Sequence, residues 1–355
     1  MIRNLTNSDY KSLTQIVQLE APILMGSLRN ILQKHYTTVK MTRDYLYAIG
    51  DIPIALVAHL DTVFPTPPAE VFFDRQKGVL WSPTGAGFDD RAGVFLILKV
   101  LAAGYKPHII FTTGEEIGAI GAANLVRVEK KPFAPMKYII QLDRRGTNDC
   151  VFYDCDNKEF VKYVSSFGFI EAFGSFTDIS EICPAWGVAG VNLSIGYRDE
   201  HSESEVLFVN PLLNTLDKVK AMLDDAENSP NWKYIRSRWA VDKNYFKSLT
   251  NVKWDGISYY NDQFLDEYED EPSDEEYLCH KCGKPFTEYE MFPVKTADNT
   301  TVYYCPDCIS DGVTWCTDCG EAFETTGDTK HCLCADCKTA RENRWKSKLK
   351  TKTNL

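Results

Sequence analysis

The sequence has no hydrophobic run long enough to cross a membrane. No stretch of its 355 residues approaches the roughly 18 uncharged apolar residues that spanning a bilayer requires. The first residues, MIRNLTNSDYKSLTQ, are polar almost at once and lack the apolar core of about 7–15 residues that is typical of a secretory signal. We therefore expect a cytoplasmic protein without a membrane segment.

Cysteine is scarce over most of the chain. Of the 12 cysteines, only Cys150, Cys155 and Cys183 precede position 279, and the other nine lie between Cys279 and Cys337. Because thiols stay reduced in the cytosol, the closely spaced C-terminal cysteines indicate metal ligation rather than a disulfide framework. The three earlier cysteines are too far apart for a metal knuckle and are expected to be packing residues.

Positive charge is also in deficit. The chain has 39 Lys and Arg against 50 Asp and Glu, which gives a net charge of −11. This balance disfavours nonspecific attraction to nucleic acid or acidic membranes. The last 18 residues nevertheless carry seven Lys or Arg, so a nucleic-acid partner remains an alternative.

An alternation of apolar runs and helical patterns begins at Pro53. The first three apolar runs are IPIALVAHLD, HIIFTTGEE and YIIQLD, and helical patterns separate them. Two further strand patterns and two helical patterns extend the alternation to Asp225, and two helical patterns and short strands at about 36–41 and 44–49 precede it. This order predicts an α/β fold in which a mostly parallel sheet is covered by helices on both faces.

Composition divides the chain into four predicted regions. A first domain covers residues 1–225, and a segment at 226–276 contains an aromatic arm and an acidic linker. The linker, DEYEDEPSDEE, has eight acids in eleven positions and should stay solvated. A cysteine-rich domain at 277–338 and a basic tail at 339–355 follow.

Potential metal ligands follow the ends of the predicted strands. They are His59 and Asp61 after the first run, Glu115 and Glu116 after the second, Asp143 after the third and His201 after the fourth, with Asp89 and Asp90 at the start of a helix. Because parallel strands end at the same edge of a sheet, these side chains should converge. So many carboxylates would repel one another without bound cations. Imidazole with carboxylate suits zinc, with manganese or cobalt as substitutes.

Five short motifs resemble, in chain order, the metal motifs of the co-catalytic di-zinc exopeptidases. They are HLDTVFP (59–65), GAGFDDRAG (85–93), TTGEE (112–116), LD (142–143) and HSESE (201–205). That superfamily includes leucyl and glutamyl aminopeptidases, peptidase T and carboxypeptidase G. The resemblance covers roughly residues 10–225 and implies a three-layer α-β-α domain of the zinc exopeptidase type.

The resemblance also implies a ligand set for two catalytic zinc ions. Asp89 would bridge the two ions. One ion would also be held by His59 and Asp143, and the other by Glu116 and His201.

Further roles follow from the same resemblance. Glu115 would be the general base that takes a proton from the attacking water. Asp61 would lie behind His59 and hold its ring by the outer hydrogen bond that metal-binding histidines commonly make. The peptide bond between Asp89 and Asp90 would be cis.

Chain length narrows the implied reaction. Only 57 residues separate Asp143 from His201, too few for the lid domain of the carboxypeptidase and deacylase branch. The segment YRDEHSESE, which contains Arg198, is similar to the corresponding segment of glutamyl aminopeptidase relatives. We therefore predict a metal-dependent aminopeptidase acting on a peptide or small amide. The alternatives are an N-acyl amino acid deacylase or carboxypeptidase-type amidohydrolase, and a non-catalytic scaffold that binds a partner.

Three polar residues near these motifs carry open interpretations. Arg144 and Arg145 follow Asp143 and could bind a substrate carboxylate, although a salt bridge within an acidic site is the simpler interpretation. Asp178, in SFTDIS, resembles a Ser/Thr-Asp pair of these enzymes, and it could equally be a helix N-cap.

Four Cys-x-x-Cys knuckles lie near the C-terminus. They are Cys279 and Cys282, Cys305 and Cys308, Cys316 and Cys319, and Cys334 and Cys337. Two knuckles supply the four thiolates of one structural zinc site, so eight cysteines predict two zinc ions in a module that resembles tandem zinc ribbons. Successive knuckles should pair, with a crossed pairing as the alternative, and His331 or Cys332 could replace a ligand. The module is expected to be structural and to offer a surface for a protein partner.

Overall fold

The structure, a computed structural model, contains two compact units. It describes residues 3–130, 135–237, 276–287, 290–296, 300–309, 313–315, 322–324 and 338–339. The first unit is built mainly from residues before position 273, and the second mainly from residues after it. Within the described ranges, no helix is long and apolar enough to cross a membrane.

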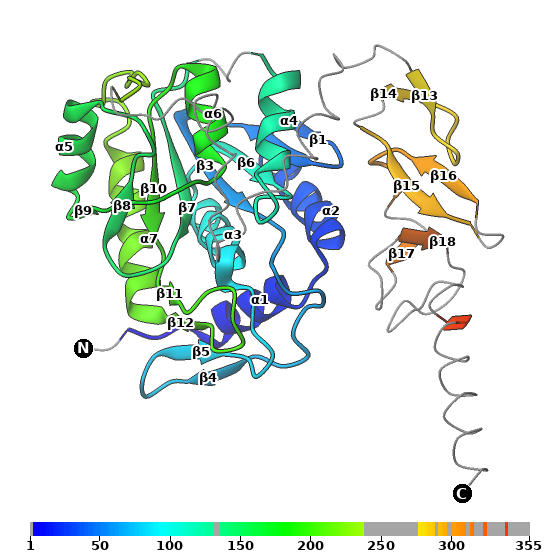
Figure 1. Cartoon of the computed structure of the whole chain (residues 1–355), viewed down its shortest axis with the longest axis horizontal. Coiled ribbons are helices and arrows are strands. Elements are labelled where there is room, and N and C mark those ends of the chain that lie inside the picture. Colours follow the sequence, from blue (N-terminus) through cyan, green and yellow to red (C-terminus); the bar gives the residue numbers. More distant parts are fainter. Residues whose placement is uncertain are drawn as a thin grey trace, which may run out of the picture. The chain divides into compact units, whose positions relative to one another are not determined.

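An eight-stranded sheet forms the centre of the first unit, with the strand order β1-β2-β6-β3-β7-β10-β8-β9 (Figure 1). The strands are β1 (Thr38–Met41), β2 (Tyr45–Ile49), β3 (Ile52–His59), β6 (Pro107–Thr112), β7 (Tyr138–Arg144), β8 (Asp149–Val151), β9 (Ile170–Glu171) and β10 (Gly190–Ser194). The central strands β6, β3, β7 and β10 are parallel to one another. Strands β2 and β8 pair antiparallel with β6 and β10. The predicted mostly parallel sheet is confirmed.

Helices cover both faces of this sheet and complete a three-layer architecture. On one face, α3 (Phe88–Ala102) contacts β3 and β7, while α1 (Asn7–Val17) and α7 (Val209–Asp224) pack against α3. On the other face, α4 (Ile120–Val128) and α6 (Ile179–Trp186) contact each other and the sheet. Helix α5 (Lys158–Ser166) contacts β9, and α2 covers Ala21–Leu32.

The continuous apolar runs of the sequence become strands that are buried on both sides. Every residue of β6 and of β10 is buried, as expected for parallel strands between two helical layers. The sequence pattern does not predict α6, a short helix that contains Pro184. Its buried side chains Ile179, Ile182 and Trp186 nevertheless join the core between the sheet and α4.

A second, antiparallel sheet of four strands lies outside the predicted pattern. Its order is β11 (Tyr197–Arg198), β12 (Val206–Phe208), β5 (Val79–Trp81) and β4 (Phe72–Asp74). Strands of two or three residues are too short for a period to be recognised in sequence. The sheet is important because it brings the segment that contains His201 beside the segment that precedes Asp89.

The chain after α7 continues along the first unit. The Lys137 ammonium donates hydrogen bonds to the carbonyl oxygens of Ala226, Glu227 and Ser229 at 2.6, 3.0 and 2.5 Å. The Trp232 ring lies 5.7 Å from that of Phe160, centroid to centroid. This part of the predicted aromatic arm therefore packs against the domain, while the acidic linker lies outside the described residues up to position 275.

The described part of the second unit contains a hairpin and a small sheet. The hairpin consists of β13 (Glu276–Leu278) and β14 (Pro285–Thr287). The sheet has the order β16 (Thr301–Tyr304), β15 (Phe292–Lys295), β18 (Ala322–Glu324) and β17 (Val313–Trp315). The buried Cys279, Met291 and Cys305 form its small core.

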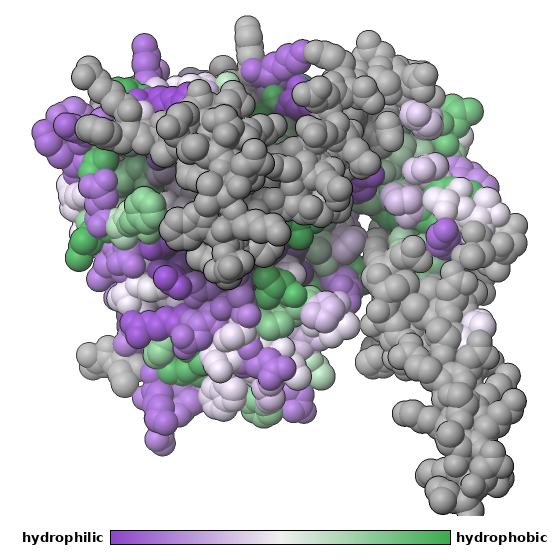
Figure 2. Space-filling model, in the orientation of Figure 1, coloured by the Kyte–Doolittle hydropathy of each residue, from purple (hydrophilic) through white to green (hydrophobic). Residues whose placement is uncertain are grey.

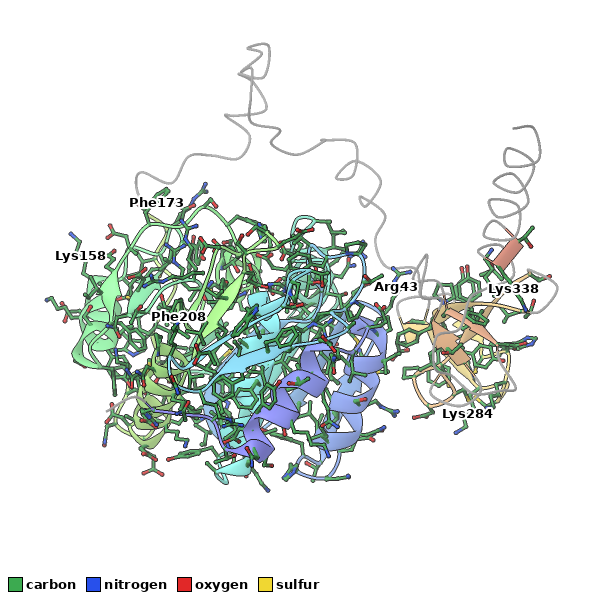
Figure 3. The ribbon with its side chains drawn as sticks, turned by 90° about the horizontal axis from the view of Figure 1, so that it is seen from below. Arg43, Lys158, Phe173, Phe208, Lys284 and Lys338 are labelled. Atoms are coloured by element: carbon green, nitrogen blue, oxygen red, sulfur yellow. The ribbon has the colours of Figure 1, made fainter. Side chains whose placement is uncertain are left out.

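The described surface of the first unit shows no single large apolar patch on the face drawn in Figure 2, where hydrophilic side chains predominate and apolar ones are scattered. Phe173 is the most exposed large apolar residue of the described chain, at 89%. It lies at the periphery of the first unit in the view of Figure 3.

Replacing Lys137 by Met should weaken the attachment of residues 226–229. Its loss removes three charge-assisted hydrogen bonds, so we expect the free energy of unfolding to fall by about 1–3 kcal/mol. Urea unfolding would measure the change. Lys77→Met, at a side chain that is 79% exposed, is the control. Equal stabilities of the two variants would contradict this role for Lys137.

Candidate metal centre and active site

The carboxyl edge of the main sheet positions the predicted ligands. His59 is the last residue of β3, and Asp143 is the last residue but one of β7. Glu115 and Glu116 follow β6. His201 follows β11 in a loop where its own φ is +61°. Segments far apart in sequence therefore end at one place, as the alternating pattern predicts.

Asp89 lies between the two histidines. Its Oδ1 is 3.2 Å from Nε2 of His59, and its Oδ2 is 3.3 Å from Nε2 of His201. Each oxygen of this one carboxylate thus faces a different imidazole. This is the arrangement required of a carboxylate that is shared by two metal ions.

A further carboxylate accompanies each histidine. Nε2 of His59 is 3.5 Å from Oδ1 of Asp143, and Nε2 of His201 is 3.0 Å from Oε2 of Glu116. The site therefore has two halves that meet at Asp89. Two candidate ligand groups have potential ligand atoms within 4.8 Å of one another: His59 with Asp89 and Glu116, and His59 with Asp90 and Asp143.

These residues fit bound cations. Burial raises the pKa of Asp143 to about 6, and the nearby charge of Asp89 contributes to the increase. Oε1 of Glu116 is buried and has no hydrogen-bond partner in the structure. A buried, unpaired carboxylate oxygen is costly unless a proton or metal occupies it. Imidazole and carboxylate donors at this spacing suit zinc.

Asp90 has a different position from Asp89 although the two are adjacent. Its Oδ2 accepts a hydrogen bond from the backbone N–H of His59 at 3.1 Å, and its Oδ1 accepts one from that of Gly93 at 3.1 Å. Both oxygens therefore hold the start of α3 against the end of β3. The peptide bond between Asp89 and Asp90 is cis, as the resemblance implies.

Asp61 supports the site in a way that the sequence did not predict. The nearest contact of the His59 ring is from Nδ1 to the backbone oxygen of Asp61, at 3.1 Å, whereas the carboxylate lies 3.5 Å away. The carboxylate also accepts hydrogen bonds from the backbone N–H groups of Glu115, at 3.3 Å, and Glu116, at 3.1 Å. It therefore orients the loop that carries both glutamates.

Asp143 is held by hydroxyl and amide groups, of which the sequence pointed only to Thr177, through its pair with Asp178. Its Oδ2 accepts hydrogen bonds from Thr177 Oγ1 at 2.7 Å and Gln141 Nε2 at 3.0 Å. Its Oδ1 accepts one from the Tyr197 hydroxyl at 3.1 Å. Such groups orient a ligand for its metal. The only sequence signal for these groups is that they lie near the predicted motifs along the chain.

Asp178 is a buried acid rather than a side-chain helix cap. It stands at the N-cap position of α6, but its side chain makes no capping hydrogen bond. Its Oδ2 accepts a hydrogen bond from Thr112 Oγ1 at 2.6 Å. Burial raises its pKa to about 7, and the charges of Asp143 and Asp61 contribute to the increase.

Glu115 belongs to neither candidate ligand group among the described residues. Burial raises the pKa of its carboxyl well above the usual range, opposed by His59 and reinforced by the charges of Asp143 and Asp178. A raised pKa makes a carboxylate a stronger proton acceptor. This property suits a group that accepts and returns a proton.

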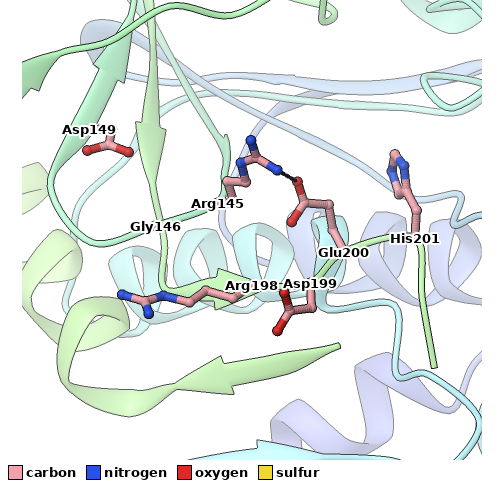
Figure 4. A pocket seen from close by; sticks show the side chains of 7 residues that line it. All are labelled: Arg145, Gly146, Asp149, Arg198, Asp199, Glu200 and His201. Atoms are coloured by element: carbon pink, nitrogen blue, oxygen red, sulfur yellow. Dashed lines mark hydrogen bonds and ion pairs between the residues drawn. The ribbon is translucent and has the colours of Figure 1, made fainter. Parts of the chain in front are cut away.

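A pocket of about 510 Å³ lies beside His201 (Figure 4). Its lining residues come from two segments of the chain, 145–149 and 198–201, and are Arg145, Gly146, Asp149, Arg198, Asp199, Glu200 and His201. Arg145 forms a salt bridge with Glu200 at 2.8 Å, as the simpler interpretation of this residue predicts. The guanidinium carbon of Arg198 lies 5.2 Å from the centroid of the Phe208 ring. Arg144 donates a hydrogen bond to the Phe173 carbonyl at 2.8 Å.

The second unit gathers the first two cysteine knuckles. Sulfur atoms of Cys279, Cys282, Cys305 and Cys308 all lie within 4.8 Å of one another, the arrangement that pairing of successive knuckles predicts. Burial tends to raise the Cys279 pKa, but backbone N–H groups, including that of Cys305 at 3.3 Å, lower it to about 6. The other candidates, Cys316, Cys319, His331, Cys332, Cys334 and Cys337, lie outside the described residues.

The buried cysteines of the first unit show no sign of a metal site in the described chain. Cys150, Cys155 and Cys183 are free and buried, and they do not belong to any candidate ligand group among the described residues. Burial raises the pKa of each thiol. They are packing residues, as expected.

Comparisons with solved structures find the fold of the first unit in a tripeptidase and an aminopeptidase. A tripeptidase from Staphylococcus aureus is 14% identical, with a TM-score of 0.51 over 62% of this chain and 98% of that chain. A TET aminopeptidase from a marine sediment archaeon of the Thaumarchaeota is 13% identical, with a TM-score of 0.50 over 63% of this chain and 99% of that chain. At these identities the likeness concerns the fold alone.

Sequence comparison gives a narrower assignment. The chain has no significant match among curated proteins. Residues 47–165 match the sequence family described as Peptidase family M28, and this range contains His59, Asp89, Glu116 and Asp143. This sequence match and the shared fold together support a metal-dependent peptidase as the interpretation of the first unit.

Proposed function

We propose that the first unit is an aminopeptidase that removes the N-terminal residue of a peptide with the help of two metal ions. The observation that carries this proposal is the position of Asp89, whose two oxygens face His59 and His201 at 3.2 and 3.3 Å. A second carboxylate stands beside each histidine. The site thus offers two ligand sets that share one residue.

The ligands divide as the geometry suggests. His59 and Asp143 would hold one ion, Glu116 and His201 would hold the other, and Asp89 would contribute to both. Zinc fits this set of nitrogen and oxygen donors, and manganese or cobalt could replace it. Two such ions, when bound, lower the pKa of water toward neutrality and polarise the carbonyl of the scissile bond.

Glu115 acts as the general base in this proposal. It removes a proton from the attacking water and later returns that proton to the departing amine. Burial raises the pKa of its carboxyl, which makes Glu115 a stronger proton acceptor. Asp61 holds the backbone of Glu115 and Glu116, so the base and a ligand keep a constant separation.

Glu115→Gln should separate catalysis from metal binding. Glutamine has the shape of glutamate but cannot accept the proton, so we expect turnover to fall by roughly 10²–10⁴-fold. The zinc content should stay unchanged, because Glu115 is outside both ligand groups. Glu116→Ala, by contrast, should lose a metal ion. Hydrolysis of aminoacyl amides and metal analysis of both variants measure this, and near-normal turnover of Glu115→Gln would refute the assignment.

The pocket beside His201 is the candidate binding site for part of the substrate. Apart from Gly146, every residue that lines it has an ionisable side chain. Such charged side chains form hydrogen bonds and ion pairs with polar or charged groups, and an apolar side chain offers them neither. We therefore propose that this pocket receives a charged or polar part of the substrate.

Substrate profiling would test this use of the pocket. We expect kcat/KM for peptides with a charged or polar N-terminal residue to exceed that for leucyl peptides by at least about tenfold, since a hydrogen bond to a charged group contributes about 1.5–3 kcal/mol. Arg198→Gln should reduce this preference. Arg236→Gln, an exposed arginine outside the pocket, is the control. A clear preference of the unaltered enzyme for leucine would contradict the proposal.

The same assay distinguishes an aminopeptidase from an N-acyl amino acid deacylase. Two arginines line the pocket, and an arginine can bind the carboxylate of an N-acyl amino acid. Release of acyl groups without release of free N-terminal residues would favour the deacylase. The complete ligand set and the buried base speak against a non-catalytic scaffold.

The second unit is proposed to be a structural zinc module that offers a surface to a protein partner. The eight cysteines of the four knuckles would bind two zinc ions. The gathered sulfur atoms of the first two knuckles support one of these sites. Closed four-thiolate sites leave no open position for chemistry.

Metal analysis of the whole chain tests both units together. Two catalytic and two structural ions predict four zinc ions per chain, counted from the ligands in the sequence. Cys279→Ser should bind one ion fewer and keep its peptidase activity, because that site is structural. Atomic emission spectroscopy on the purified chain measures the count. Loss of peptidase activity with loss of this one zinc would contradict a purely structural role.

A further inference from the structure

Glu205 is a buried carboxylate in the loop that follows His201. Its side chain is 0% exposed, and both of its oxygens accept hydrogen bonds from the backbone of the Asp89 segment. Oε2 accepts from the N–H groups of Ala86 at 3.2 Å and Gly87 at 2.6 Å. Oε1 accepts from the N–H of Asp89 itself at 2.9 Å. Glu205, four residues after the candidate ligand His201, thus holds the backbone of the candidate ligand Asp89.

The shape of the Asp89 segment explains why these N–H groups are available. Gly85 and Gly87 have φ values of +75° and +65°, a conformation that glycine adopts without strain. Asp89 has non-helical angles, φ −78° and ψ 104°, so the regular part of α3 begins after it. N–H groups at the start of a helix have no partner within the helix and attract anions. Here the carboxylate of Glu205 is that anion.

Glu205 also has a fixed position relative to its own loop. Its backbone N–H donates to the carbonyl of Ser202 at 3.1 Å. The next residue, Val206, begins β12 and pairs with Trp81 of β5, a few residues before the Asp89 segment. The loop from 201 to 205 and the segment from 85 to 89 are therefore joined by a short sheet and by the three hydrogen bonds of one carboxylate.

The two halves of the metal centre are supported unequally. His59 and Asp143 stand on neighbouring strands of the main sheet, whose parallel register pairs Val57 with Gln141. His201 stands on a loop, and its side chain is 52% exposed. The main sheet therefore holds the first half directly. The second half depends on how the His201 loop is attached to Asp89.

We propose that Glu205 is a positioning residue that holds Asp89 opposite His201 and thereby sets the affinity of the half-site formed by Asp89, Glu116 and His201. This inference rests on the proposed two-ion function. Residues outside the ligand sphere commonly change metal affinity by about 10–100-fold when they are replaced. The half-site of His59 and Asp143 should change much less, because the sheet orders it.

Manganese titration of the full-length chain can measure the two halves. Mn²⁺ favours carboxylate and imidazole over thiolate ligands, so the cysteine module contributes little to the signal. Free Mn²⁺ would be followed by electron paramagnetic resonance after removal of resident metal from the first unit. Glu205→Gln keeps the size of the side chain but loses one acceptor oxygen. Glu203→Gln is the matched control, an exposed glutamate in the same loop.

We expect two ions to bind the unaltered chain and the Glu203→Gln variant. In Glu205→Gln the dissociation constant of the weaker ion should rise by about 10–100-fold, with little change in the tighter one. His201→Ala should lose the same ion, and the double variant should lose nothing further. Equal affinities in Glu205→Gln and Glu203→Gln would overturn the role of Glu205.

Other outcomes separate this inference from the function on which it rests. If the unaltered chain bound fewer than two ions, the two-ion function would fail independently of Glu205. If Glu205→Gln did not fold, Glu205→Asp would replace it, since aspartate keeps the charge on a shorter side chain. That variant should weaken the same ion selectively, and equal weakening of both ions would overturn the inference.

Discussion

The site of the first unit depends on the interaction of the Asp89 carboxylate with the imidazoles of His59 and His201. The carboxylate oxygens lie 3.2 and 3.3 Å from His59 and His201, with Asp143 and Glu116 alongside. Three carboxylates this close together would repel one another strongly unless cations or protons lay between them. The α/β architecture brings the ends of its parallel strands to this point, and metal ions bound there would make the convergence favourable.

Several acids near the centre accept hydrogen bonds from the backbone. The Asp61 carboxylate accepts hydrogen bonds from the backbone N–H groups of Glu115 and Glu116. The Asp90 carboxylate accepts them from those of His59 and Gly93. The Glu205 carboxylate accepts them from the backbone around Asp89. Each of these carboxylates orients the main chain that carries a ligand or the base. The motifs therefore contain more acids than the proposed ligand set. The additional carboxylates accept backbone hydrogen bonds in irregular loops, where no helix or sheet provides such partners.

The sequence predicted the fold where its signals were local. The runs that became β3, β6 and β7 are continuously apolar because helices cover both faces of the sheet, and ligands stand at their ends. The sheet of β11, β12, β5 and β4 could not be predicted, since its strands have only two or three residues. Helix α6 was missed as well, because it is short and contains a proline whose cost tertiary packing offsets.

The sequence by itself determined the residue types of both metal sites, the order of the strands and helices, and the knuckle spacing of the cysteine module. These properties depend on chemistry and on neighbours along the chain. Only the tertiary structure decided which acid faces a histidine and which accepts backbone N–H groups. Asp89 and Asp90 are adjacent in sequence, and Glu203 and Glu205 share one loop, yet their roles differ. A carboxylate has the same chemistry in either role, and only the direction in which the folded backbone points it distinguishes the two.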